Sequence, residues 1–504
     1  MSTDEPSHEQ DIPRPAPAPS VPVRYRLAPL FGLVVLGLIP VAALTALLVW
    51  SDDIADEYEA SESVGAETFE PIGEPAAALT TSISDYRRAP VDLARIGADN
   101  ELATSLEQLA AFIDGRSCLA VSVDGRQVST WNGDVPVIPA STNKLLVGGA
   151  AIELLGADYR FSTAVAAPAP VDGVVEGDLY LIGGGDPLLV AGGLELDEVP
   201  AAPTSLDLLA DSVVAAGITS IRGAVVGDAS RYDAEFVNPT WQDGDAYVEA
   251  GPIGGLLVND GRVVGRSARQ RDPGEAAARE FARLLADRGV AVSNGWRAGL
   301  LEPGIPEIAS VESAPLTAVV SDMLTRSDND TAEMLLKELG YLVAQPGTTS
   351  AGIDVLERTV RSWGTPMDEV VFADGSGLSA DNQLTCDALV AVLDHLEETP
   401  AADGLPVAGR SGTLIDEFLG SPVEGRLVGK TGTLSNPPVD ADPPEVKALA
   451  GYLDAPNGET LQFAIVLNGA GYVTTEGYVP FWSALADRLA VHPTGPDPAL
   501  LGPR

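Results

Sequence analysis

The stretch Ser141-Thr142-Asn143-Lys144 marks the point where short β-prone runs give way to a helical pattern. Apolar residues recur from 145 to 155 at the spacing of one helix face, and Gly156 is a suitable stop. Positions i and i+3 share a helix face, so Lys144 is within reach of Ser141. The pattern predicts a helix whose first turn carries a serine beside a lysine.

Lysine is rare in this chain, with four among 504 residues, and two of the four stand in short motifs. Lys144 closes a Ser-x-x-Lys, and a second lysine opens Lys430-Thr431-Gly432-Thr433. Between these two motifs lies Ser327-Asp328-Asn329. Coding bias explains the scarcity, since 26 arginines replace lysine almost everywhere, but it does not explain why half of the lysines lie in these motifs.

The first motif supplies a nucleophile and a base. A serine hydroxyl is a weak nucleophile until a nearby base accepts its proton. None of the three histidines, His8, His395 and His492, has a recognisable Ser-His-Asp setting. Burial of Lys144 beside another cation such as Lys430 would lower its pKa and make the neutral amine accessible. We therefore predict lysine rather than histidine as the base.

The other two motifs suit substrate binding. Ser327 is placed to relay a proton to a leaving amine, and Asn329 to hydrogen-bond a substrate amide. Lys430, Thr431 and Thr433 on an edge strand would bind a substrate carboxylate. Gly432 leaves room for substrate backbone to lie alongside the strand.

Each motif has an ordinary structural interpretation when taken alone. A Ser-x-x-Lys arises by chance, Ser-Asp-Asn is a common turn or helix N-cap, and Lys-Thr-Gly ends many strands. All three in this order, on a helix start, an inter-helix loop and a strand, favour the catalytic interpretation.

Composition excludes several classes of function. The formal net charge is −43, from 73 acidic and 30 basic residues, so nucleic acid and anionic membrane surfaces are unfavourable partners. The two cysteines, Cys118 and Cys386, are too few for a disulfide scaffold or a metal site. One disulfide between them outside the cytoplasm and two small buried thiols both remain open. The sequence predicts no cofactor.

A membrane anchor is predicted near the start of the chain. Residues 27–50 are nearly continuously apolar and carry no charge, which is long enough for a spanning helix. Arginines precede the segment and acidic residues follow it, so residues 1–26 are expected in the cytoplasm and the rest outside. A cleaved signal peptide is the alternative, disfavoured by the long Pro-rich leader and the lack of a clean cleavage site.

Beyond the anchor, the expected fold is α/β (α+β). Its core is one five-stranded antiparallel sheet with helices packed on it. An early hairpin around Asp124-Gly125 supplies two strands. A strand at 427–434 and a hairpin at 447–453 and 461–467 supply the other three, and 479–489 is a closing helix. The middle of the chain is an insertion, β-rich with one helix near 273–288.

The predicted organisation has seven parts. These are a disordered tail (1–26), a transmembrane helix (27–50), a stalk (51–95), the first part of the sheet domain (96–162), the inserted region (163–304), the second part of the sheet domain (305–492) and a C-terminal tail (493–504).

With these motifs the sequence resembles the low-molecular-mass penicillin-binding proteins of the D-alanyl-D-alanine carboxypeptidase/endopeptidase type, which carry a large insertion between the first two motifs. The resemblance covers roughly residues 100–490. It rests on seven segments: Pro139 to Leu145, Gly184-Gly185-Asp186-Pro187, Val258-Asn259-Asp260-Gly261, Asp374 to Ser379, Gly412-Thr413-Leu414, Gly429 to Leu434, and Ala448 to Tyr452.

The resemblance implies a transpeptidase-like fold and a serine-type DD-peptidase. Ser141 would be the acyl-enzyme nucleophile and Lys144 the proton acceptor, with Ser327 and Asn329 in the second motif and Lys430 binding substrate. Backbone N–H groups of Ser141 and Thr433 would form the oxyanion hole. The implied partners are peptidoglycan stem peptides, as substrate, and β-lactams, as covalent inhibitors.

The chain departs from this family in two respects. Its insertion is shorter than usual, and a transmembrane anchor is not a general family feature. A class A β-lactamase is one alternative, although the 186 positions between Ser141 and Ser327 argue against it. A membrane-anchored β-lactam sensor is another, although 26 residues before the anchor offer little cytoplasmic output.

Overall fold

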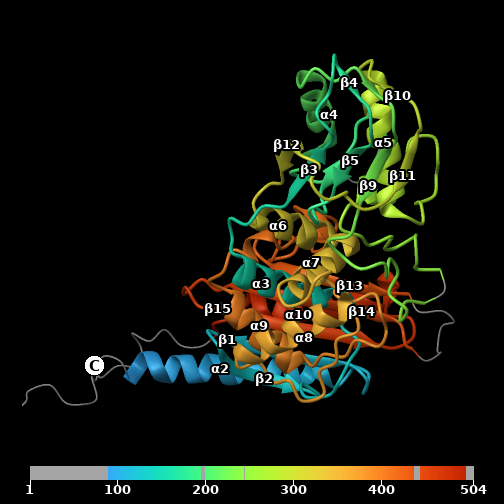
Figure 1. Ribbon diagram of the computed structural model, residues 1–504. Helices are drawn as coiled ribbons and strands as arrows, with labels where there is room; N and C mark the ends of the chain where they lie inside the picture. Colours follow the sequence, from blue (N-terminus) through green and yellow to red (C-terminus); the bar gives the residue numbers. More distant parts are fainter. Residues whose placement is uncertain (1–88, 195–198, 243, 436–442, 495–504) are drawn as a thin grey trace, which may run out of the picture. The chain divides into compact units, whose positions relative to one another are not determined.

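The computed structural model describes residues 89–194, 199–242, 244–435 and 443–494, all within one compact unit (Figure 1). The predicted cytoplasmic tail and transmembrane segment lie outside the described residues, and so does the stalk up to residue 88. Of the helices described, none combines the length and the apolar character needed to cross a membrane.

The predicted five-stranded antiparallel sheet is confirmed, with the order β13-β14-β15-β1-β2. Strands from the start of the chain thus lie next to strands from its end, as Figure 1 shows for β1 and β15. Asp124 and Gly125, with φ of 45° and 71°, form the turn of the early hairpin. The strands are β1 (Cys118–Val123), β2 (Arg126–Trp131), β13 (Val428–Leu434), β14 (Val446–Asp454) and β15 (Thr460–Asn468).

Helices cover both faces of this sheet because its three central strands, β1, β14 and β15, are apolar on both sides. Small residues such as Ala448, Ala450 and Ala464 face one side and let α3, α6, α7 and α9 pack closely. Larger residues such as Leu449 and Phe463 face α2 and α10. The helices are α2 (Ala89–Ala110), α3 (Lys144–Leu155), α6 (Leu316–Arg326), α7 (Asn329–Tyr341), α8 (Thr349–Ser362), α9 (Cys386–Leu396) and α10 (Thr475–Ala490).

The sequence did not predict helix α2. Its first residues, 89–95, fall within the segment that we expected to be stalk. Only a narrow stripe of the helix is buried, chiefly Leu102, Leu106 and Leu109, which pack beneath the sheet. The i, i+4, i+7 spacing of these leucines was the available signal.

The residues between α3 and α6 form further sheets. One has five strands in the mixed order β11-β9-β5-β3-β12, a second is β10-β8-β4, and β6 pairs with β7. The strands are β3 (Ser162–Ala166), β4 (Val174–Val175), β5 (Leu179–Ile182), β6 (Leu189–Val190), β7 (Thr204–Ser205), β8 (Ser220–Ile221), β9 (Val225–Asp228), β10 (Ala291–Val292), β11 (Trp296–Ala298) and β12 (Glu307–Glu312).

Two details of this region differ from the prediction. It contains two helices rather than one, α4 (Leu206–Ala215) and α5 (Pro273–Asp287), and only the second was predicted. Strand β12 lies beyond residue 304, where we expected the inserted region to end, yet it pairs with β3 in the second five-stranded sheet.

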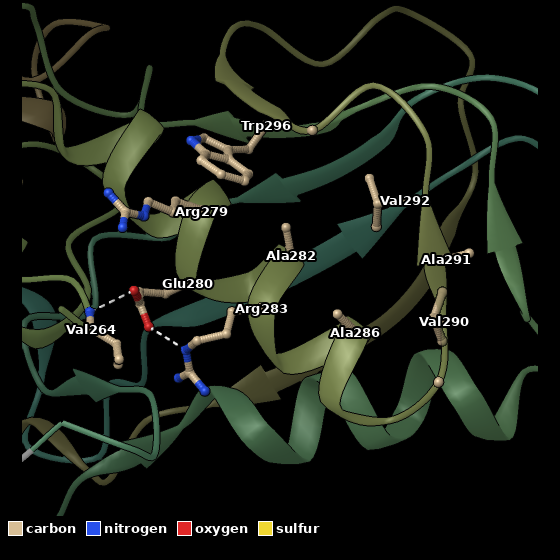
Figure 2. A pocket seen from close by; sticks show the side chains of 12 residues that line it. Val264, Arg279, Glu280, Ala282, Arg283, Ala286, Val290, Ala291, Val292 and Trp296 are labelled. Carbon is tan, nitrogen blue, oxygen red and sulfur yellow. Dashed lines mark hydrogen bonds and ion pairs between the residues drawn. The ribbon is translucent and has the colours of Figure 1, made fainter.

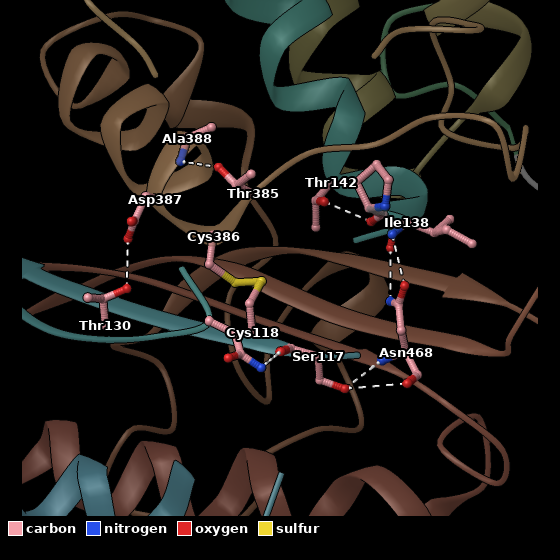
Figure 3. Close-up of a disulfide and its surroundings, with 12 residues drawn as sticks. Ser117, Cys118, Thr130, Ile138, Thr142, Thr385, Cys386, Asp387, Ala388 and Asn468 are labelled. Atoms are coloured by element: carbon pink, nitrogen blue, oxygen red, sulfur yellow. Dashed lines mark hydrogen bonds between the residues drawn. A yellow bond between two sulfur atoms is a disulfide. The ribbon is translucent and has the colours of Figure 1, made fainter. Parts of the chain in front are cut away.

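The two cysteines form a disulfide, which settles a point that the sequence left open. Cys118 at the start of β1 bonds to Cys386 at the start of α9, across 268 positions of sequence (Figure 3). Asn468 of β15 lies nearby and hydrogen-bonds the backbone of Ile138, just before the Ser-x-x-Lys motif. A cross-link over so long a loop restricts the unfolded chain and typically stabilises a fold by about 2–4 kcal/mol.

Candidate active site

The Ser-x-x-Lys motif lies where a short 3-10 turn, Ala140–Asn143, runs into α3. The turn is held against the sheet by two close approaches of backbone. A Cβ on Gly377 would lie 1.9 Å from the carbonyl oxygen of Ala140, and one on Gly432 would lie 2.9 Å from that of Pro139. Only glycine fits at the first of these positions, so the loop around Gly377 fixes where the turn sits.

The amine of Lys144 is fully buried and has three partners. Its Nζ lies 2.8 Å from Ser141 Oγ, 2.7 Å from Asn329 Oδ1 and 2.6 Å from the carbonyl oxygen of Ser376. The amide of Asn329 is oriented by donating from Nδ2 to the carbonyl of Glu249, at 3.0 Å. Two of the three partners of the amine are therefore oxygens that only accept.

This arrangement directs the lone pair of a neutral Lys144. A neutral amine donates its two protons to Asn329 Oδ1 and the Ser376 carbonyl, which leaves the lone pair facing the hydroxyl of Ser141. Burial lowers the pKa of Lys144 from 10.5 to about 8, against the opposing pull of Asp374 and other carboxylates. The base form is thus accessible near neutral pH.

The second motif places a serine in an unusual backbone conformation. Ser327 ends α6 with φ of 63°, in the left-handed region that non-glycine residues rarely adopt. Asp328 then caps α7 by accepting from the N–H of Thr331 at 2.6 Å, which confirms the N-cap interpretation of this motif. The motif is therefore a turn and a helix cap that also presents its serine.

The third motif reaches the second through Lys430 on β13. Its Nζ donates to Ser327 Oγ at 2.7 Å and to the carbonyl of Thr431 at 2.7 Å. Burial, together with repulsion from the nearby Lys144, lowers the pKa of Lys430 well below its usual value. Two lysines and two serines therefore form adjacent pairs, Lys144–Ser141 and Lys430–Ser327.

These groups border one pocket of about 510 Å³. Five of the predicted site residues line it: Ser141, Ser327, Asn329, Thr431 and Thr433. The buried amines of Lys144 and Lys430 contact the lining hydroxyl groups of Ser141 and Ser327. The other lining residues are Gln242, Asp245, Glu249, Leu378, Thr413, Leu434, Ser435 and Lys447.

Thr413 and Lys447 were missed as site residues. Thr413 Oγ1 accepts from Thr431 Oγ1 at 2.7 Å. Lys447 on β14 donates to Thr433 Oγ1 at 3.2 Å, and its amine lies 4.2 Å from the centre of the Tyr478 ring. The rarity of lysine was an available signal for Lys447, because three of the four lysines of the chain lie at this site.

A buried network holds the Ser376 carbonyl against Lys144. Glu333 of α7 accepts from the N–H groups of Gly375 and Ser376 at 3.0 and 2.7 Å. Asp374 accepts from Trp241 Nε1 at 2.9 Å. The carboxyl group of Glu333 therefore positions the loop that binds the base.

A second buried contact supports the Ser-Asp-Asn motif. Asp330 accepts from the N–H of Gly251 at 2.6 Å and forms an ion pair with Arg269 at 2.5 Å. Both charged side chains are at least nine-tenths buried. Residues between α3 and α6 therefore help to fix the start of α7.

This fold, with a lysine-activated serine beside a serine–asparagine turn and a Lys-Thr-Gly strand, defines a serine enzyme of the penicillin-interacting class. The chain belongs to the D-Ala-D-Ala carboxypeptidase 3 (S13) family, whose model matches residues 103–276 and 252–477. The family model thus spans both the central sheet and the region between α3 and α6.

Individual relatives agree with this assignment. The chain is 31% identical to the carboxypeptidase DacB of Mycolicibacterium smegmatis, over 85% of this chain and 92% of that protein. It is 30% identical to a D-alanyl-D-alanine carboxypeptidase of Actinomadura, over 68% of this chain and 76% of that protein. It shares the fold of penicillin binding protein 4 from Haemophilus influenzae, with a TM-score of 0.64 at 20% identity, covering 76% of this chain and 98% of the other.

The lowered pKa of Lys144 predicts a pH dependence of acylation. The rate constant for acylation by penicillin should rise with pH, with a midpoint near the pKa of about 8, because the neutral amine accepts the proton of Ser141. Stopped-flow labelling between about pH 6 and pH 9 measures this profile. A His395→Gln variant should keep the same midpoint, and a flat profile in the unchanged protein would contradict the assignment.

Proposed function

We propose that this protein is a serine-type D-alanyl-D-alanine carboxypeptidase/endopeptidase that acts on peptidoglycan stem peptides and is inhibited by β-lactams. The observation that carries the proposal is the 2.8 Å contact between Lys144 Nζ and Ser141 Oγ at the base of the pocket. Family membership and the name of the Actinomadura relative support the choice of substrate.

In the proposed reaction, Ser141 Oγ attacks the carbonyl carbon of the D-Ala-D-Ala peptide bond while Lys144 takes its proton. The backbone N–H groups of Ser141 and Thr433 stabilise the oxyanion. Ser327, which Lys430 contacts at 2.7 Å, passes a proton to the leaving amine. D-Alanine departs, and water then hydrolyses the acyl-enzyme.

Substrate binding falls to the edge strand and the second motif in this proposal. Lys430, Thr431 and Thr433 bind the terminal carboxylate, and Asn329 hydrogen-bonds the substrate amide. Gly432 contributes by letting β13 approach the turn that carries Ser141, because a Cβ at this position would lie 2.9 Å from the carbonyl oxygen of Pro139. Incubating the protein with purified peptidoglycan and identifying the products by mass tests this proposal: free D-alanine reports carboxypeptidase action, and split cross-links report endopeptidase action.

The lifetime of the penicilloyl-enzyme separates this function from that of a β-lactamase. Rapid deacylation by a class A β-lactamase requires a glutamate that activates water. The glutamate nearest to the second motif in sequence, Glu333, is occupied by two backbone N–H groups. We expect the penicilloyl-enzyme to persist for minutes or longer and D-alanine to be released from a D-Ala-D-Ala peptide.

Intact-protein mass spectrometry after a penicillin pulse measures the lifetime, and amino-acid analysis measures D-alanine. Roughly tens of penicillin turnovers per second, a typical enzyme rate, with no D-alanine released would instead establish a β-lactamase.

We also propose that residues 27–50 anchor the protein in the cell membrane as a single span. The catalytic part would then lie outside the cytoplasm, as a transpeptidase-like domain built on the central sheet and interrupted by the inserted region between α3 and α6. The charge pattern around the span supports this topology. The disulfide supports it too, since disulfides persist mainly in oxidising compartments.

Protease added to intact cells should release a soluble fragment cleaved between residue 51 and the start of α2 at Ala89. The expected result follows from the topology, because only the segment outside the membrane is exposed to the protease. Sequencing the N-terminus of the released and the untreated protein provides the measurement. An untreated protein that begins after residue 50 would show signal cleavage and contradict the anchor.

A further inference from the structure

A groove between α5 and β11 carries an arrangement that the catalytic proposal does not use. It has a volume of about 620 Å³, and a smaller hollow of about 380 Å³ shares two of its residues, Arg279 and Trp296. Figure 2 shows these two side chains at one end of the groove and Val290, Ala291 and Val292 toward the other. None of the lining residues belongs to the catalytic pocket.

Trp296 is exposed in a way that the other described tryptophans are not. Its exposed fraction is 45%, whereas every other tryptophan within the described ranges is buried or half-buried. The residue lies on β11, an edge strand of its sheet. The guanidinium of Arg279 lies 5.7 Å from the centre of its ring, a cation–π contact that holds the indole beside α5.

Three arginine side chains near Trp296 form neither an ion pair nor a hydrogen bond. Most arginines that the structure describes contact a carboxylate or a carbonyl, as expected where acidic residues are in large excess. Within the described ranges five have a guanidinium group with neither an ion pair nor a hydrogen bond: Arg222, Arg266, Arg271, Arg279 and Arg358. Three of these five, Arg266, Arg271 and Arg279, line the smaller hollow together.

Two carboxylates, Asp272 and Glu275, also line this hollow, and neither forms an ion pair with the three arginines. Asp272 Oδ1 accepts from the N–H of Glu275 and thereby caps α5. Glu275 is exposed in the first turn of that helix. Glu280 in the larger groove is paired with Arg283 and accepts from the N–H of Val264, as Figure 2 shows. Three guanidinium groups without a carboxylate partner therefore remain for an external anion, and one of them, Arg279, also contacts the ring of Trp296.

We propose that this groove binds peptidoglycan, with Trp296 stacking on a sugar ring of the glycan strand and the arginines binding carboxylates of the stem peptides attached to it. Arginine forks match carboxylates in geometry and charge, and an exposed indole offers a flat apolar face. A densely charged phosphate polymer would be repelled by a protein of net charge −43, whereas peptidoglycan carries its carboxylates on stem peptides that are spaced along the glycan strand. The proposal takes only the identity of the polymer from the proposed function.

Such a site would act by holding the protein on its polymeric substrate. A second attachment raises the effective concentration of stem peptides at the catalytic pocket without changing the chemistry there. Turnover of a small D-Ala-D-Ala peptide would then be independent of the groove, while binding to intact cell-wall sacculi would depend on it.

Co-sedimentation of the purified full-length protein with insoluble sacculi tests the proposal. Trp296→Ala and the double variant Arg266→Ala/Arg271→Ala should each weaken binding about tenfold or more, as loss of an aromatic or arginine anchor commonly does. Acylation by penicillin and D-alanine release from a small peptide should be unchanged. Matched controls are Arg222→Ala/Arg358→Ala, which removes two other unpaired arginines, and Phe112→Ala, which removes another exposed aromatic ring.

The proposal would be overturned by full sacculus binding by the groove variants, by an equal loss in the control pair, or by a parallel loss of small-peptide turnover. Sacculi stripped of phosphate polymers with hydrofluoric acid should bind as well as untreated ones, and loss of binding on stripping would point to the phosphate polymer instead. A protein that binds sacculi through the groove but releases no D-alanine would contradict the proposed function alone.

Discussion

Ser141→Ala is expected to lose all covalent labelling by a fluorescent penicillin and at least about a thousandfold in D-alanine release, as removal of a catalytic nucleophile commonly does. The reason is positional, because Ser141 is the hydroxyl that lies 2.8 Å from the buried amine of Lys144. Mass spectrometry of the labelled peptide identifies the acylated residue in the unchanged protein.

Ser212→Ala on α4 is a suitable control, because it removes a hydroxyl that donates only to the carbonyl of Leu208 within its own helix. This variant should label and turn over normally. An adduct on Ser327 in the unchanged protein, or full labelling of Ser141→Ala, would contradict the assignment of Ser141 as the nucleophile.

Lys144→Arg should lower the acylation rate by several orders of magnitude. A guanidinium does not deprotonate in proteins, so it cannot accept the proton of Ser141. It is also larger and planar, whereas the present site offers three oxygens around a single amine nitrogen. Pre-steady-state labelling with penicillin measures the rate, and thermal unfolding confirms that the variant is folded.

The histidines provide the comparison for this base. His395 stacks on Trp363 and lies 3.4 Å from Glu153, and His492 lies 3.4 Å from Glu459. Neither lines the catalytic pocket. A His395→Gln/His492→Gln variant should therefore acylate at nearly the normal rate, and a folded but inactive double variant would refute the lysine-base mechanism.

The central sheet was predictable because its signals are local. The turn at Asp124-Gly125 and the one near Asn457-Gly458 each join two β-prone runs, so both hairpins are visible in the sequence. The strands between α3 and α6 are different. Five of them have only two residues, which is too short for any alternation to show, and α4 lies among them.

In the candidate site, too, only the contacts set by local sequence spacing could be predicted. The pairing of Ser141 with Lys144 follows from helix spacing alone. The contacts of Lys144 with the Ser376 carbonyl, and of that loop with Glu333, join segments whose separation in sequence no local pattern specifies. The disulfide belongs to this second group, because its two cysteines are 268 positions apart.

The strand order of the central sheet has a consequence for when the enzyme becomes competent. β1 lies between β2 and β15, so one of its two neighbours comes from residues 460–468. Ribosomal synthesis proceeds from the N-terminus, and this long-range contact therefore cannot form until nearly the whole chain exists. The Lys-Thr-Gly strand also arrives late, long after Ser141. A nascent or truncated chain that carries the nucleophile and its base still lacks the strand that closes the pocket, so completion of the polypeptide itself governs the onset of reactivity toward substrate and penicillin alike.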